Sequence, residues 1–198
     1  MYFLLFQLGL ISVCGLLVPR FVFRNFRFLF GLSFMSLLAI TVVISYGAKR
    51  VGQNVDEFQV VKWESNEPID LNDFKGQAVI LFFFNPFQES FAKEPAKVMQ
   101  QQVFEHFKSQ GGNRNGVPVT FLTLNTFPSG GTAQTNRIID YAGLELVGVD
   151  DATKVSAAVN QFQYEFLPMV ALLNGVEGSP SHSLWEIIEI DDDFKSSK

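Results

Sequence analysis

Two long apolar stretches come first in the chain, and shorter apolar segments separated by polar turns follow them. Residues 1–18 are interrupted only by Gln7 and stop at Pro19, and residues 28–47 are apolar or small throughout, without a charge. At 1.5 Å per residue, these stretches would measure about 27 and 30 Å as helices, close to the thickness of the hydrocarbon core of a bilayer. The pattern predicts a membrane anchor in residues 1–50, built as a hairpin of two transmembrane helices.

A cleaved signal peptide is the alternative explanation of the apolar N-terminus. A signal peptide begins with basic residues and ends at a small-residue cleavage site, and residues 1–18 lack the basic start and a convincing site of that kind. Residues 28–48 are a weaker candidate for a signal, with cleavage after Ala48. We therefore expect both spans to be retained.

The loop between the predicted spans combines arginine with phenylalanine. Arg20, Arg24 and Arg27 fall on one face of a helix, with phenylalanines between them. Side chains of these two kinds lie at the headgroup level of a bilayer, so the arginines are candidates for contacts with lipid headgroups. Basic residues of a short loop stay on the cytoplasmic or matrix side, which puts the rest of the chain on the opposite side. Lys49 and Arg50 weigh against this orientation.

Residues 51–198 show the alternating patterns of a soluble α/β domain. Continuous apolar runs at 78–84 and 117–124 predict two strands that are buried on both faces. Shorter apolar segments and helical spacing predict the remaining elements: strands at 58–63, 144–149, 170–173 and 185–190, and helices at 91–107, 133–141 and 153–164. Strands that alternate with helices form a central sheet covered by helices.

Two local features qualify these helices. Pro95 lies inside the first helix, where proline is tolerated only near the first turn or at a kink. Asp150 and Asp151 precede Thr153, so we expect them to cap the start of the last helix.

Charge divides the chain at the same place as hydrophobicity. Residues 1–50 contain five basic residues and no acid, whereas the rest carries ten basic and 20 acidic residues, a net charge of −10. An acidic domain repels nucleic acid, which excludes that class of partner. The asymmetry fits a basic membrane end and a well-solvated acidic head.

The most specific pattern begins in the first buried run. Residues 79–95 read VILFFFNPFQESFAKEP, they follow the sequence LNDFKG at 71–76, and FLPM occurs much later at 166–169. This order resembles the thioredoxin-like superfamily over about residues 58–190, with membrane-tethered thiol–disulfide oxidoreductases and peroxiredoxin-like proteins nearest. The resemblance implies a thioredoxin-like fold, a central mixed sheet flanked by helices, and a cis-proline at Pro168 beside the active site.

The cysteines of such an active site are missing. By the resemblance they would fall at Gln88 and Phe91, and Phe87 stands where the family has a tryptophan. The chain's single cysteine, Cys14, lies in the first apolar stretch. Thiol–disulfide exchange and peroxide reduction both need a thiolate nucleophile. A copper site like that of the related Sco chaperones would need the same cysteines and a histidine. We therefore predict a redox-inactive protein that is not an enzyme.

No other motif supplies chemistry. His106 and His182 do not form a zinc-binding pair, and the acidic run 191–193 lacks the spaced oxygens and the glycine of a calcium loop. The glycine-rich segments 111–116 and 129–131 lack the Gly-Lys-Ser/Thr of a phosphate loop and are expected to be turns. We expect no metal and no cofactor.

These observations favour a non-catalytic structural or assembly subunit of a multi-subunit membrane complex, of the respiratory or photosynthetic type. Its expected partners are the other subunits and the lipid bilayer. The mitochondrial inner membrane is favoured over a bacterial inner membrane or the thylakoid, with the domain in the intermembrane space, periplasm or lumen. The expected partner face comprises Phe87, Gln88, Phe91 and Pro168. Two alternatives stay open: a membrane-tethered chaperone or peptide-binding module, and a redox protein that relies on a partner's thiol or metal.

Overall fold

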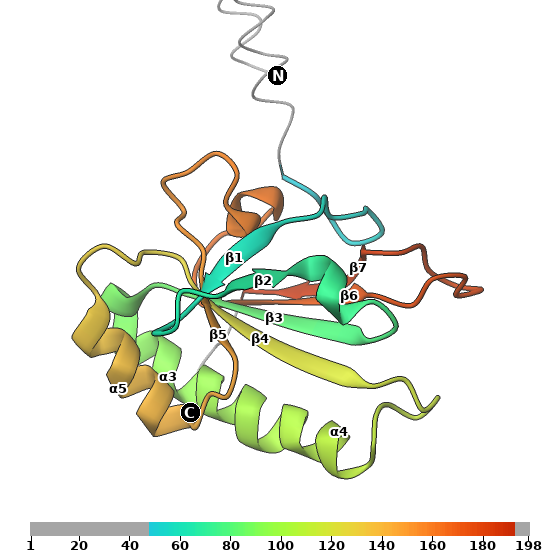
Figure 1. Ribbon diagram of the computed structural model, residues 1–198, viewed down its shortest axis with the longest axis horizontal. Helices are drawn as coiled ribbons and strands as arrows, with labels where there is room; N and C mark the ends of the chain where they lie inside the picture. The colour runs from blue at the N-terminus through green and yellow to red at the C-terminus, as the bar shows by residue number, and fades with distance from the viewer. Residues whose placement is uncertain (1–47, 193–198) are drawn as a thin grey trace, which may run out of the picture. The chain divides into compact units, whose positions relative to one another are not determined.

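The structure is a computed structural model of the chain, and it describes residues 48–192 (Figure 1). The predicted spans at 1–18 and 28–47, and with them Arg20, Arg24 and Arg27, lie outside these residues. Within 48–192, no helix combines the length and the apolar character needed to cross a membrane.

Seven strands form one mixed sheet with the order β2-β1-β5-β4-β3-β6-β7. β3 pairs in parallel with β4, and β4 in parallel with β5, while all other neighbours are antiparallel. The strands are β1 (Gln59–Lys62), β2 (Pro68–Asp70), β3 (Ala78–Phe84), β4 (Val119–Asn125), β5 (Val147–Val149), β6 (Met169–Asn174) and β7 (Glu186–Asp191). The six predicted strands are confirmed, although β5 is shorter than expected. β2 was not predicted, because its three residues fall in a segment that reads as a polar turn.

Three α-helices lie together on one side of the sheet (Figure 1). They are α3 (Glu89–Val98), α4 (Glu105–Ser109) and α5 (Thr132–Ala142), and a π-helical segment, Met99–Phe104, joins α3 to α4. The predicted helices 91–107 and 133–141 are confirmed. Pro95 lies in the interior of α3 rather than in its first turn. Because proline has no N–H, it cannot donate to the carbonyl four residues earlier, and the wider π turn begins soon after it.

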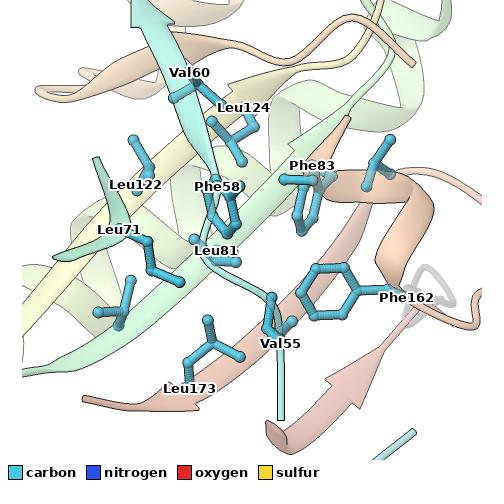
Figure 2. Close-up of a cluster of buried hydrophobic side chains, with 14 of the residues drawn as sticks. Val55, Phe58, Val60, Leu71, Leu81, Phe83, Leu122, Leu124, Phe162 and Leu173 are labelled. Atoms are coloured by element: carbon cyan, nitrogen blue, oxygen red, sulfur yellow. The ribbon is translucent and has the colours of Figure 1, made fainter. Parts of the chain in front are cut away.

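Two buried clusters lie on opposite faces of the sheet. Phe82 and Phe84 point to the helical side, where Ala92 and Ala96 of α3 cover them. Phe83 points to the other side, into a cluster that contains Phe58, Leu81 and Phe162 (Figure 2). All three phenylalanines of β3 are fully buried, as predicted. Burial on both faces is the reason that this strand is apolar at every position and does not alternate.

The predicted helix at 153–164 is wrong. The structure has only a 3-10 helix there, Ala158–Gln161, after an irregular loop. The carboxylate of Asp151 accepts hydrogen bonds from the backbone N–H and the hydroxyl of Thr153, 3.1 and 2.7 Å away. Bonds of this kind offer the backbone an alternative to the helix. Asp151 therefore stabilises a turn where a helix cap was expected.

Asp150 is not a cap before Thr153 either. Its side chain is buried, 3% exposed, and accepts hydrogen bonds from the N–H groups of Ala158 (2.7 Å) and Val159 (2.8 Å). Just beyond, Phe162 packs against Phe83 with 5.2 Å between the ring centroids. Asp150, which directly follows β5, thus fixes the 3-10 helix against the sheet through these hydrogen bonds. Phe162 packs on the same face of the sheet, against Phe83.

Candidate functional site

The candidate site lies where β3 ends. After Phe84 the chain passes through Asn85 into a 3-10 helix, Pro86–Gln88, and α3 begins at the next residue. The side chain of Asn85 accepts a hydrogen bond from the N–H of Phe87, 3.0 Å away. Pro86 follows at the first helical position, where its missing N–H costs nothing. The turn therefore fixes positions 87 and 88 directly before the N-terminus of α3.

Gln88 and Phe91, at the expected cysteine positions, are exposed, Phe91 to 68%. Phe87, at the tryptophan position, is 59% exposed. Pro168 is buried and follows a cis peptide bond, as the resemblance implied. Met169 pairs with Phe83, so Pro168 lies one residue further along, beside the end of β3. The four predicted site residues therefore gather at the same end of the sheet.

The loop after β4 forms a second wall of this site. Asn125 holds the loop through two hydrogen bonds, accepting from the N–H of Phe127 (2.9 Å) and donating to the hydroxyl of Thr135 (3.1 Å). Gly131 packs so closely that an added Cβ would lie 2.4 Å from Cγ of Pro86. Only glycine fits at that position, and the loop is thereby fixed against the turn that carries Phe87.

Glu89 is the only acidic residue in the first turn of α3, and its carboxylate is already engaged. Arg137 of α5 forms an ion pair with it, with Nη2 2.6 Å from Oε2, and Lys93 approaches its other oxygen. The hydrogen bonds from Arg137 and then Lys93 lower the pKa of Glu89 to about 2. A carboxylate held in this way links α3 to α5 and is a poor proton acceptor.

The four predicted site residues, Phe87, Gln88, Phe91 and Pro168, carry no thiol, hydroxyl, imidazole or carboxyl group. Residues 48–192 contain no cysteine, and in this range no group of three or more His, Cys, Asp or Glu side chains could hold a metal ion. His182 contacts Glu186, with Nδ1 3.1 Å from Oε1, at the beginning of β7 and thus at the far end of the sheet. What the site presents is a surface of aromatic rings around a buried proline.

Sequence reasoning missed two parts of this surface. Phe166 is 69% exposed, two residues before Pro168. The N–H of Glu165 donates to the carboxylate of Asp192, so the end of β7 reaches the same loop. An aromatic residue just before the expected cis-proline could have indicated Phe166. The proximity of the acidic residues depends on how β6 pairs with β7, which has no local pattern.

No protein-family model and no curated protein matches the sequence, whereas solved structures do. The thioredoxin domain of a thiol-disulfide oxidoreductase from Bacteroides vulgatus has a TM-score of 0.54 at 14% identity, over 73% of this chain and 89% of that one. A thiol:disulfide interchange protein from Bacteroides sp. has a TM-score of 0.52 at 14% identity, over 72% and 81%. The C-terminal domain of an uncharacterized Bacteroides fragilis protein has a TM-score of 0.52 at 17% identity, over 73% and 91%. The chain therefore has a thioredoxin-like fold, and likeness at such low identity shows nothing more.

Proposed function

We propose that this chain is a non-catalytic structural or assembly subunit of a multi-subunit membrane complex, in which the thioredoxin-like domain is a protein-interaction scaffold. The anchor in residues 1–50 would hold the domain at the membrane. The charge of the loop around Arg20, Arg24 and Arg27 favours the intermembrane-space, periplasmic or lumenal side. The mitochondrial inner membrane is the favoured location.

One observation carries the proposal: three exposed phenylalanines lie around the positions where a redox enzyme of this fold has its thiols, and one of them, Phe91, occupies such a position. Phe87, Phe91 and Phe166 are each more than half exposed at one end of the sheet. Large aromatic side chains in water lose the free energy that burial would provide, and clustered ones mark interaction sites. Aromatic residues also supply a large share of the binding energy of protein interfaces.

The site is built rigidly enough to serve as a fixed contact surface. The Asn85 bond, the close packing of Gly131 on Pro86 and the Glu89–Arg137 ion pair hold the turn, the loop after β4 and α5 together. A preformed surface loses little conformational entropy on binding. This favours a stable complex over a transient enzyme–substrate contact.

The test uses the full chain in its own membranes. An affinity-tagged chain, solubilised in mild detergent, should co-purify with partner subunits in fixed stoichiometry. The double variant Phe87→Ala/Phe91→Ala should reduce partner recovery at least tenfold, because an aromatic side chain that becomes buried at an interface contributes on the order of 2 kcal/mol to the binding free energy. Val51→Ala is the matched control: Val51 is 56% exposed and lies near the beginning of β7, at the opposite end of the sheet.

Other outcomes point to the alternatives. Recovery of many unrelated peptides in place of fixed partners would favour a chaperone or peptide-binding module. Reduction of insulin disulfides or peroxides by the purified chain would contradict a non-catalytic role. Activity that appears only when a partner is added would favour a redox protein that borrows a thiol or a metal.

A further inference from the structure

The helical layer covers the sheet unevenly. In β6, Ala171 and Leu173 point away from the helices and are fully buried, whereas Val170 and Leu172 point to the helical side and stay partly exposed. The two faces of one strand therefore differ in how well they are covered. The helices of residues 48–192 therefore leave the helical side of β6 partly uncovered, and we refer to this part of the sheet as the open region.

α3 turns an apolar stripe toward this open region. Phe91, Pro95 and Val98 are spaced i, i+4 and i+7 and so share one face of the helix. Phe91 is 68% and Val98 41% exposed. The stripe is two helical turns long, about 10 Å.

The position of α5 shows which way the stripe faces. Lys93 and Lys97 of α3 lie over the ring of Tyr141 in α5, 5.5 and 5.0 Å from its centroid. At 100° per residue these lysines and the apolar stripe lie on opposite flanks of the sheet-facing side of α3. α5 is on the β5 side, since Asn136 accepts a hydrogen bond from Trp63 at the end of β1. The stripe therefore faces β6.

Acidic residues form the far side of the open region. Glu189 and Asp191 of β7 are exposed and pair with Leu172 and Val170, so all four side chains share one face of the sheet. Glu189 forms no ion pair with any residue of 48–192. The lysines of α3 are turned to Tyr141 of α5. The result is an apolar surface, formed by Val170, Leu172 and the stripe of α3, with the exposed carboxylates of Glu189 and Asp191 along one side.

We infer that this apolar surface binds an amphipathic helix of a partner subunit, apolar on the side that contacts the surface and rich in Lys or Arg on the side that faces β7. The inference rests on the proposed function and names the chemistry of the partner. A helix fits because it would lie beside α3 and continue the helical layer over β6. Basic residues fit because complementary charge steers association and rejects wrong partners. An anionic lipid surface would be repelled by the same carboxylates.

Site-specific photo-crosslinking tests the inference in native membranes. p-Benzoyl-phenylalanine is placed at Val98 of the full chain, the membranes are illuminated, and the crosslinked peptide is sequenced by mass spectrometry. We expect one subunit segment with apolar residues at i and i+4 and at least three Lys or Arg within about four helical turns. An acidic or unpatterned peptide, a lipid adduct, or no adduct would overturn the inference. The same probe at Phe87 reports on the proposed partner face, and at Val51 it is the negative control.

Charge variants test the acidic side of this surface. Glu189→Gln should lower the crosslinking yield at position 98 about two- to fivefold at low salt, as expected for an exposed ion pair. Raising KCl to 500 mM should lower the yield of the unmodified chain, and it should lower the yield of Glu189→Gln less. Glu177→Gln, exposed in the turn between β6 and β7 at the far end, should have no effect. Equal yields for Glu189→Gln and Glu177→Gln would contradict the basic partner.

The two proposals fail in different ways. A subunit crosslinked from position 87 but not from position 98 would support the scaffold function and contradict helix binding at the surface over β6. No stoichiometric protein crosslinked from either position would remove both.

Discussion

Replacing Asp150 by alanine should destabilise the domain strongly for so small a change. The carboxylate of Asp150 accepts hydrogen bonds from the N–H groups of Ala158 and Val159, and all three residues are buried. In Asp150→Ala both donors lose their acceptor in a place that water reaches poorly. An unsatisfied buried donor costs about 1–3 kcal/mol.

Removing the carboxylate also has a favourable effect, which partly offsets the free-energy cost of leaving these two N–H groups without an acceptor. Burial raises the pKa of Asp150, which means that its charged form is itself opposed by the surroundings, although the two N–H groups counteract this. We therefore expect a net loss of about 2–4 kcal/mol, within the range for a broken buried network. For a domain of about 150 residues this lowers the melting temperature by about 5–15 °C.

Thermal unfolding followed by tryptophan fluorescence measures this loss in the full chain in mild detergent. Both tryptophans of the chain, Trp63 and Trp185, lie in the described domain, and Trp185 is buried. Asp151→Ala is the matched control, because the Asp151 carboxylate contacts only the adjacent turn, through hydrogen bonds from Thr153 and an ion pair with Lys154. If Asp150→Ala melted no lower than Asp151→Ala, the two N–H bonds would not hold the loop.

The pH dependence gives a second readout for Asp150. Because its pKa is raised on folding, the native state binds this proton more tightly than the unfolded state. The contribution of Asp150 to stability is then greatest at low pH and falls as the pH rises through the native pKa. The non-titrating variant Asp150→Asn lacks this dependence. The stability of the unmodified chain relative to Asp150→Asn should therefore increase as the pH is lowered from 7 toward 4, and a decrease would refute the sign.

Two further predictions concern packing and charge. Phe83→Ala should lower the free energy of unfolding, measured in urea, by about 3–5 kcal/mol, because it opens a cavity beside Phe162. Phe87→Ala removes an exposed ring and should lower it by less than about 1 kcal/mol. Equal losses would contradict the assignment of Phe83 to the core and Phe87 to the surface. Glu89, whose pKa is lowered to about 2 chiefly by the hydrogen bond from Arg137, stabilises the folded state above pH 4.5, and this contribution is lost as the pH falls through 2. Glu89→Gln should lower the melting temperature at pH 7 and have progressively less effect below pH 4.5, so an effect that grows in acid would contradict the pairing.

The order of the elements could be predicted from local patterns. The apolar runs that became β3 and β4 are buried on both faces, so their composition alone identifies them as central strands. The helical spacing of α3 and α5 likewise predicted helices that the structure contains. These elements follow their local patterns because tertiary contacts agree with them.

The segment from Asp150 to Phe162 shows where local patterns fail. Its apolar residues have helical spacing, yet Val155 is 99% exposed while Val159 is fully buried. The bonds from Ala158 and Val159 to Asp150 and the packing of Phe162 on Phe83 join residues from separate elements. Contacts of this kind override helix propensity, which is a weak effect.

The sequence by itself determined that residues 48–192 supply no thiolate in any conformation, because they contain no cysteine. It also placed Phe87, Gln88 and Phe91 just after a central strand, since the strand and the helix adjoin along the chain. Only the tertiary structure decided that Phe166 and the acidic residues of β7 share that end of the sheet with them. That proximity depends on the pairing of β6 with β3 and β7, and pairing joins residues far apart in sequence, which no local pattern can specify.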